Sequence, residues 1–306
     1  MIIGIVGAGG IGGYYAGLLS RAGFPVRLLA RGEHLDAIRS RGLEIRRQNE
    51  RFVAEVEASD DGAVLRGSDY VIVAVKGYSL DDVGPAIAGA GASGAAVVPL
   101  LNGVDVADRL QRLGVPRESI IGGLARVSVV KSAPGLIERH STFDRITIGE
   151  LDRVPRPRTE QLASALAKAG TTVDVSGDIV LDLWRKFAFI VPMSVACGLV
   201  RGPAGWVMGT ERGRALITNA LHEIVLLSRA AGGALSDADE AKTTEDLFAL
   251  APGMRPSFLY DLERGGPTEL DLLAGAVSRL GRVHQVATPI HDVATAAFEA
   301  ATQPRS

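Results

Sequence analysis

The chain contains one cysteine, few aromatic residues and almost no excess charge. With Cys197 as the only cysteine among 306 residues, no disulfide can form within the chain, and we expect a reducing, cytoplasmic location. The net charge is -2. Because nucleic-acid binding needs a basic surface, we expect no nucleic-acid partner.

Several catalytic motifs are also missing. There is no H-E-x-x-H pair and no cysteine cluster, so we expect no metal site. The chain has neither a G-x-x-x-x-G-K-[ST] phosphate loop nor a G-x-S-x-G nucleophile turn. The histidines are scattered: His34, His140, His222, His284 and His291.

Two uncharged runs in the interior of the chain raise the question of a membrane span. Residues 83–104 are interrupted by glycines and prolines, a pattern that predicts helix, loop, strand and loop. Residues 187–200 are too few to cross a bilayer and predict a buried helix. We therefore expect no membrane contact, and the apolar start lacks the cationic stretch of a secretory signal.

The most informative feature is a glycine-rich turn that follows an apolar strand-like segment at residues 2–6. Gly7 permits the tight turn, Gly9 lets backbone N–H groups approach a pyrophosphate, and Gly12 lets a following helix pack closely. The N-terminus of that helix would then face the anion. The pattern G-x-G-x-x-G predicts a dinucleotide site formed by Gly7, Ala8, Gly9, Gly10, Ile11 and Gly12.

The remaining pattern predicts an α/β fold in two parts. Apolar strands alternate with helices in an N-terminal Rossmann-type, doubly wound parallel sheet, which we assign to residues 1–177 as the NADP-binding domain. Helical spacing then dominates in residues 178–306, which we assign to an all-helical substrate and catalytic domain. Residues 43–47 and 52–57 predict a hairpin with a turn at Asn49 and Glu50.

Arg31 stands near the end of the second predicted strand, where NAD-preferring sites usually carry an acid about 20 residues after the glycines. A guanidinium can bind a 2′-phosphate in bidentate fashion, so NADP is the favoured cofactor. The alternatives are that Arg31 is a solvated loop residue, and that nearby Glu33 permits NAD.

Lys186 leads into a mostly apolar helix, where a lysine is costly to bury unless it has a partner or a role. At helical spacing Ile190 and Ser194 share its face, and an amine in a partly apolar cleft can act as a proton donor. The alternative is that Lys186 extends to water from a packed helix.

The ordered set of motifs resembles the ketopantoate reductase (2-dehydropantoate 2-reductase) family, from Met1 to about Pro289. In that family an NADPH-dependent Rossmann domain joins a helical domain, with the substrate in the cleft between them. The segments that carry the resemblance are the glycine turn, Val75-Lys76, Leu100-Leu101-Asn102-Gly103, Leu183-Trp184-Arg185-Lys186-Phe187, Pro256-Ser257-Phe258-Leu259-Tyr260-Asp261-Leu262 and Thr268-Glu269-Leu270-Asp271.

The resemblance implies roles for individual residues. Lys186 matches the family's proton-donating lysine and Glu269 its glutamate. Lys76 matches a cofactor-contacting lysine, Asn102 an asparagine beside nicotinamide and substrate, and Ser257 a substrate-binding serine. Each has a simpler alternative: Glu269 as helix first-turn charge, Ser257 as a cap, Asn102 as a turn former and Lys76 as a solvated loop residue.

Two positions depart from the family. One and two turns after the lysine the family commonly carries asparagines that bind the substrate, where this chain has Ile190 and Ser194. Each lost amide would leave a substrate oxygen unpaired, at a cost of about 1–3 kcal/mol. A less polar 2-oxo acid or related ketone therefore stays open as the substrate.

The resulting hypothesis is an NADPH-dependent reductase of a small 2-oxo acid, with ketopantoate reduction to pantoate in pantothenate biosynthesis as its leading form. The alternatives are a related hydroxyacid or polyol-phosphate dehydrogenase, and a non-catalytic NADP-binding regulator. The apolar helices of the second half could bury against a second copy, as a homodimer, or against each other.

Overall fold

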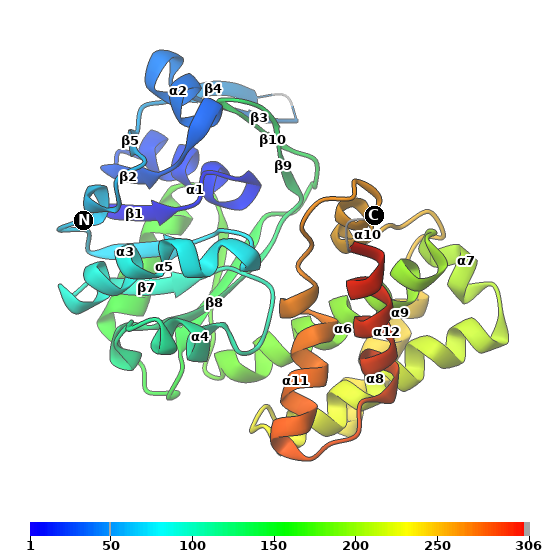
Figure 1. Ribbon diagram of the computed structural model, residues 1–306. Coiled ribbons are helices and arrows are strands. Elements are labelled where there is room, and N and C mark those ends of the chain that lie inside the picture. Colours follow the sequence, from blue (N-terminus) through cyan, green and yellow to red (C-terminus); the bar gives the residue numbers. More distant parts are fainter. Residues whose placement is uncertain (49, 303–306) are drawn as a thin grey trace. The chain divides into compact units, whose positions relative to one another are not determined.

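The computed structural model describes residues 1–48 and 50–302, and the chain forms two compact units (Figure 1). The first unit comprises Met1–Leu101 and Val106–Ile179. The second comprises Asn102–Asp105 and the chain from Val180 onward. The single boundary between residues 177 and 178 remains a prediction, and the short segment Asn102–Asp105 groups with the helices rather than with the strand that precedes it.

The first unit carries all the strands of the described residues. Its strands are β1 (Ile3–Val6), β2 (Val26–Leu29), β3 (Leu43–Arg47), β4 (Glu50–Ala54), β5 (Glu57–Ser59), β6 (Tyr70–Val73), β7 (Ala96–Pro99), β8 (Ile121–Arg126), β9 (Val129–Ala133), β10 (Leu136–Arg139), β11 (Arg145–Glu150) and β12 (Thr172–Val175). Its helices are α1 (Gly10–Arg21), α2 (Gly32–Arg41), α3 (Leu80–Ala92), α4 (Val106–Arg112) and α5 (Pro157–Lys168), with 3-10 turns at Gly62–Leu65, Gly77–Ser79 and Arg117–Ser119.

The central sheet is parallel, with strand order β5-β2-β1-β6-β7. Strands β1, β6 and β7 are buried along their whole length, as expected for a parallel sheet covered on both faces. The chain continues from β1 to β2 on one side and later adds β6 on the other. The strand order therefore reverses beside β1, which is where doubly wound folds bind their ligands.

Two smaller sheets complete the first unit. One has the order β4-β3-β10-β9 and the other β12-β11-β8. The predicted hairpin exists, because β3 and β4 pair antiparallel. The expected turn at Glu50 is wrong, since Glu50 begins β4 and pairs with Arg47; Asn49 lies outside the described residues. The expected strand at residues 52–57 ends at Ala54, and Glu57 begins β5 in the central sheet.

Helix α1 lies against both the central sheet and the β4-β3-β10-β9 sheet, and its glycines make this approach possible (Figure 1). A Cβ on Gly13 would stand 2.8 Å from Ile137 Cγ1, and a Cβ on Gly10 would stand 2.5 Å from the Val129 carbonyl oxygen. A Cβ on Gly17 would likewise collide with the Ile45 side chain. These three glycines lie on one face of the helix, so β3, β9 and β10 rest directly on its backbone.

The second unit is helical. Its helices are α6 (Ile179–Val200), α7 (Ala204–Met208), α8 (Glu211–Ala230), α9 (Asp237–Phe248), α10 (Ser257–Glu263), α11 (Ala274–His284) and α12 (Pro289–Thr302), with a 3-10 turn at Leu270–Leu272. The core of this unit contains Trp184 and Phe187 of α6, whose rings meet edge to face at 5.8 Å. Gly198 of the same helix faces Phe258 and Phe298.

Helix α6 is the one described helix that is long and apolar enough to cross a membrane, judged by length and composition alone. Its most apolar window has a mean hydropathy of 1.5, but 61% of that window is buried inside the protein. Such burial is typical of the central helix of a folded core, which is the role that the sequence predicted for residues 187–200.

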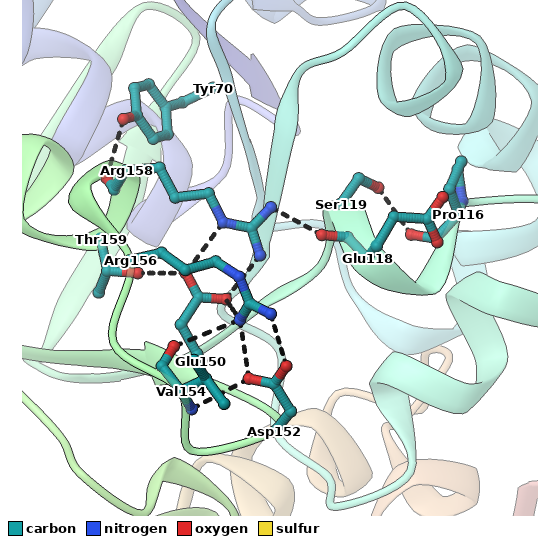
Figure 2. A network of polar contacts seen from close by, with 10 residues as sticks. All are labelled: Tyr70, Pro116, Glu118, Ser119, Glu150, Asp152, Val154, Arg156, Arg158 and Thr159. Atoms are coloured by element: carbon teal, nitrogen blue, oxygen red, sulfur yellow. Dashed lines mark hydrogen bonds and ion pairs between the residues drawn. The ribbon is translucent and has the colours of Figure 1, made fainter.

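A buried carboxylate anchors the start of α5 (Figure 2). Glu150, at the end of β11, has a side chain only 4% exposed and accepts two hydrogen bonds from Arg158, at 2.9 and 2.5 Å, and one from Thr159 at 2.7 Å. Burial opposes ionisation of Glu150, but these hydrogen bonds outweigh it and hold the pKa of the carboxyl below its ordinary value. Arg156 lies at the rim, where it pairs with the exposed Asp152 at 2.6 Å and makes a longer contact with Glu150 Oε2 at 3.2 Å.

We expect Arg158→Met to lower the free energy of unfolding by about 2–3 kcal/mol, because it leaves the Glu150 carboxylate buried with weaker pairing. Arg156→Met, at the exposed rim of the same cluster, should have a clearly smaller effect. Urea unfolding monitored by circular dichroism measures both. The lowered pKa means that the Glu150 pairing stabilises the fold above the ordinary value of 4.5 and is lost as the pH falls, so the variant and the wild type should converge in acid.

Candidate active site

The carboxyl ends of four parallel strands bring most of the predicted nucleotide residues to one edge of the central sheet. Val6 of β1 is in register with Leu29 of β2 and Val73 of β6, and Val73 is in register with Pro99 of β7. The loops that leave these strands therefore begin side by side. They carry Gly7–Gly12, Arg31, Lys76 and Asn102.

The glycine turn has the shape that a dinucleotide requires. Gly7 adopts φ +95°, which favours glycine, and its position faces Val75 in the loop after β6. A side chain on Gly12 would collide with the Gly7 carbonyl oxygen. At Gly9, which precedes the first residue of α1, a Cβ would meet nothing within 4 Å. The turn is thus closed toward the sheet and open where a pyrophosphate would lie at the helix N-terminus.

Arg31 and Lys76 each lie directly before the helical segment that follows their strand. Arg31 precedes α2, and its side chain is 77% exposed, with one guanidinium nitrogen 3.7 Å from Asp82 Oδ2. An exposed pair at this distance is weak, so the guanidinium can exchange the carboxylate for a phosphate. Lys76 precedes the 3-10 turn Gly77–Ser79 and is half-buried.

In the second unit, Arg279 connects the segments that carry Asn102 and Glu269. Its guanidinium contacts Asp105 Oδ2 at 2.7 Å and Asp271 Oδ1 at 2.7 Å. Asp105 is buried and lies three residues after Asn102, whereas Asp271 lies two residues after Glu269. One cation therefore holds two candidate segments that are far apart in the sequence.

Glu269 is only 8% exposed and immediately precedes the 3-10 turn Leu270–Leu272. It belongs to no regular helix first turn, and its backbone carbonyl accepts hydrogen bonds from the N–H groups of Leu272 and Leu273.

Lys186, Ile190 and Ser194 share one face of α6, as predicted from their spacing. Lys186 and Ile190 are half-buried and Ser194 is 5% exposed. The Ser194 hydroxyl donates to the Ile190 carbonyl oxygen at 2.7 Å, a bond that serines in helices often form. A ligand beside this face would meet apolar surface at Ile190 and a hydroxyl oxygen at Ser194 that has already donated its proton.

Ser257 is exposed and is the first residue of α10, with Pro256 in the capping position. Among residues 1–48 and 50–302, no group of three or more histidine, cysteine, aspartate or glutamate residues is placed to hold a metal ion. The burial of Cys197 raises the pKa of its thiol to about 11, which makes it a poor nucleophile.

Two family models match the chain along nearly its whole length. The model for ketopantoate reductase PanE/ApbA matches residues 3–153, and the model for its C-terminal part matches residues 178–302. The chain belongs to the ketopantoate reductase family. Members of this family are NAD(P)-dependent oxidoreductases that act on CH–OH donors.

Individual relatives agree with the family models. A 2-dehydropantoate 2-reductase of Mesorhizobium japonicum is 32% identical over 330 residues, covering 97% of this chain and 96% of the relative. An uncharacterized oxidoreductase, YkpB, of Bacillus subtilis is 30% identical over 293 residues, covering 94% of each.

Solved structures share the fold. A PanE/ApbA family ketopantoate reductase from Ralstonia eutropha JMP134 has a TM-score of 0.89 at 29% identity, covering 99% of this chain and 98% of that one. A D-mandelate dehydrogenase with NADH and anilino(oxo)acetate has a TM-score of 0.87, covering 99% and 98%. Its 21% identity shows the fold alone.

Asp105 and Arg279 were not among the site residues predicted from the sequence. The signal for Asp105 was present, because it is the first charged residue after the uncharged run 83–104. Arg279 carries no such signal, since its partners are distant in the sequence and arginine is common on helix surfaces.

We expect Gly12→Ala to impair stability and Gly9→Ala to impair nucleotide binding. Gly12→Ala should lower the free energy of unfolding by about 1–3 kcal/mol, because the methyl group meets the Gly7 carbonyl. Gly9→Ala should keep the wild-type unfolding midpoint and weaken nucleotide binding, because its methyl group projects into open space that a pyrophosphate would occupy. Thermal unfolding and titration with NADPH separate the two. Equal losses of stability in both variants would contradict this account of the turn.

Proposed function

We propose that the protein is a cytoplasmic, NADPH-dependent reductase that converts a small 2-oxo acid to the 2-hydroxy acid. The leading substrate is 2-dehydropantoate, giving pantoate for pantothenate biosynthesis, as the names of the relatives suggest. The observation that carries the proposal is the half-buried Lys186, in a chain that matches the family along both parts. Lys186 does not lead into the helix, as expected from the sequence, but lies two turns inside α6, which begins at Ile179.

The glycine turn, Arg31, Lys76 and Asn102 would hold the nicotinamide cofactor, which supplies a hydride when bound. Backbone N–H groups at the start of α1 bind the pyrophosphate, and the Arg31 guanidinium binds the 2′-phosphate. Lys76 and Asn102 contact the cofactor from the loops after β6 and β7.

Lys186 acts as the proton donor. Its ammonium donates a hydrogen bond to the carbonyl oxygen of the 2-oxo acid and stabilises the negative charge that develops there. The oxygen takes a proton from Lys186 as the alcohol forms, and the neutral amine regains a proton from water. Glu269 accepts a hydrogen bond from the product hydroxyl, and Asn102 and Ser257 donate to the substrate carboxylate.

The face of α6 argues for a substrate less polar than ketopantoate as the second candidate. Ile190 offers no hydrogen bond, and the Ser194 hydroxyl proton already goes to the Ile190 carbonyl. A panel of 2-oxo acids that vary in polarity at C3 and C4, followed by NADPH absorbance, distinguishes the two candidates. NADPH binding without oxidation by any member of the panel would reject the reductase and favour a non-catalytic NADP-binding regulator.

We expect Lys186→Met to lower kcat by about 10²–10⁴-fold while NADPH still binds, because a general acid contributes this much. Arg185→Gln removes the neighbouring cation, which pairs with Asp239 at 2.8 Å, and should leave kcat close to the wild-type value. Steady-state kinetics and NADPH fluorescence measure the two effects. Undiminished turnover in Lys186→Met would remove the lysine from the mechanism.

We expect Arg31→Ala to raise KM for NADPH about tenfold and to leave KM for NADH unchanged, because only NADPH carries the 2′-phosphate. Asp82→Asn is the matched control. It removes the carboxylate that lies 3.7 Å from Arg31 and should lower KM for NADPH slightly. Equal changes for both cofactors would show that Arg31 does not select between them.

A further inference from the structure

His34 is buried beneath the glycine turn, and nothing in the proposed mechanism uses it. It lies in the first turn of α2 and is 7% exposed. Ala37 and Arg41 lie on the same face of α2 as His34, and this face packs against the turn between β9 and β10. There Arg41 donates a hydrogen bond to the Pro134 carbonyl oxygen at 2.6 Å. That turn is also held by the Glu44 N–H, which donates to the Gly135 carbonyl at 2.8 Å.

Both ring nitrogens of His34 have backbone partners, and these partners define its tautomer. The Gly135 N–H donates to Nδ1 at 2.8 Å, so Nδ1 carries no proton. Nε2 lies 2.7 Å from the Ala8 carbonyl oxygen, which can only accept. The ring is therefore neutral, with its proton on Nε2, and it connects the β9–β10 turn to the glycine turn.

The electrostatic setting agrees with a neutral ring. Burial lowers the pKa of His34, and the nearby Lys131 lowers it further, while the hydrogen bond to Ala8 acts in the opposite direction. The net pKa lies below the ordinary histidine value of 6.5. The neutral tautomer thus persists at physiological pH.

The Ala8 carbonyl belongs to the same peptide unit as the Gly9 N–H. The chain has no cis peptide among the described residues, and in a trans peptide the C=O and N–H groups point in opposite directions. A group that fixes the direction of the Ala8 carbonyl also fixes the direction of the Gly9 N–H. His34 fixes that carbonyl from the protein interior, so the N–H points away from His34.

We propose that His34 is a positioning residue for the dinucleotide site: by holding the Ala8 carbonyl, it orients the Gly9 N–H toward the pyrophosphate. The proposal rests on the proposed nucleotide-binding function. It predicts an effect on both NADPH and NADH, because the two share the pyrophosphate, in contrast to the effect of Arg31.

Two substitutions separate positioning from a merely structural role. In His34→Asn the amide oxygen can replace Nδ1 and accept from Gly135, but the side chain is too short to reach Ala8. In His34→Gln the amide N–H₂ can replace Nε2 and donate to Ala8, while the contact with Gly135 is lost. Each variant loses one hydrogen bond, so a structural role alone would affect them equally.

We expect His34→Asn to raise the Kd of NADPH and of NADH on the order of tenfold, the factor that one hydrogen bond of about 1.4 kcal/mol represents. His34→Gln should bind both nucleotides nearly as the wild type does. His140→Asn, at an exposed histidine in the same unit, is the control and should change nothing. Fluorescence titration gives Kd, thermal unfolding without nucleotide reports stability, and kcat at saturating NADPH should stay unchanged in all three variants.

Wild-type affinity in folded His34→Asn, or equal weakening in the Asn and Gln variants, would overturn the proposal. If His34→Asn does not fold, the wild type itself provides the test: NADPH must shift the NMR resonance of the Gly9 amide, and an unresponsive Gly9 amide overturns the proposal. A wild-type protein that binds neither nucleotide would instead reject the proposed function, so the two failures are distinguishable.

Discussion

The close approach of α1 to two sheets is the constraint on which the nucleotide side of the molecule depends. Gly12 brings the helix against the turn after β1, and Gly10, Gly13 and Gly17 bring it against the β4-β3-β10-β9 sheet. Each contact leaves no room for a methyl group. The helix that presents its N-terminus to the anion is thus fixed by backbone packing on both sides, and its direction does not depend on flexible side chains.

Much of the fold follows from local patterns in the sequence. The apolar runs of β1, β6 and β7 predicted buried parallel strands, and the change to helical spacing near residue 178 predicted the helical second part. Helix α5 was not predicted from the sequence, because the Pro/Arg-rich residues 153–158 at its start are typical of a turn. In the structure Pro157 opens the helix, a position that proline favours, and Arg158 binds the buried Glu150.

Local sequence patterns do not predict which strands pair when they are far apart in the chain. Strand β3 pairs with β10 in parallel, although about 90 residues separate them, and nothing local in either strand specifies the partner. In the candidate site, too, local features were predictable and long-range contacts were not. The loops at strand ends were predictable from chain order, whereas the contact of Arg279 with Asp105, and the contact of His34 with Ala8, depend on tertiary packing.

Helix α6 has a consequence for how the protein is made. The helices that bury it lie C-terminal to it, with Phe258 in α10 and Phe298 in α12 both packed on Gly198. During synthesis, an apolar segment of 22 residues leaves the ribosome well before its covering helices exist. The nascent second unit therefore passes through a stage in which its most apolar segment is uncovered, and aggregation competes with folding until α12 is complete.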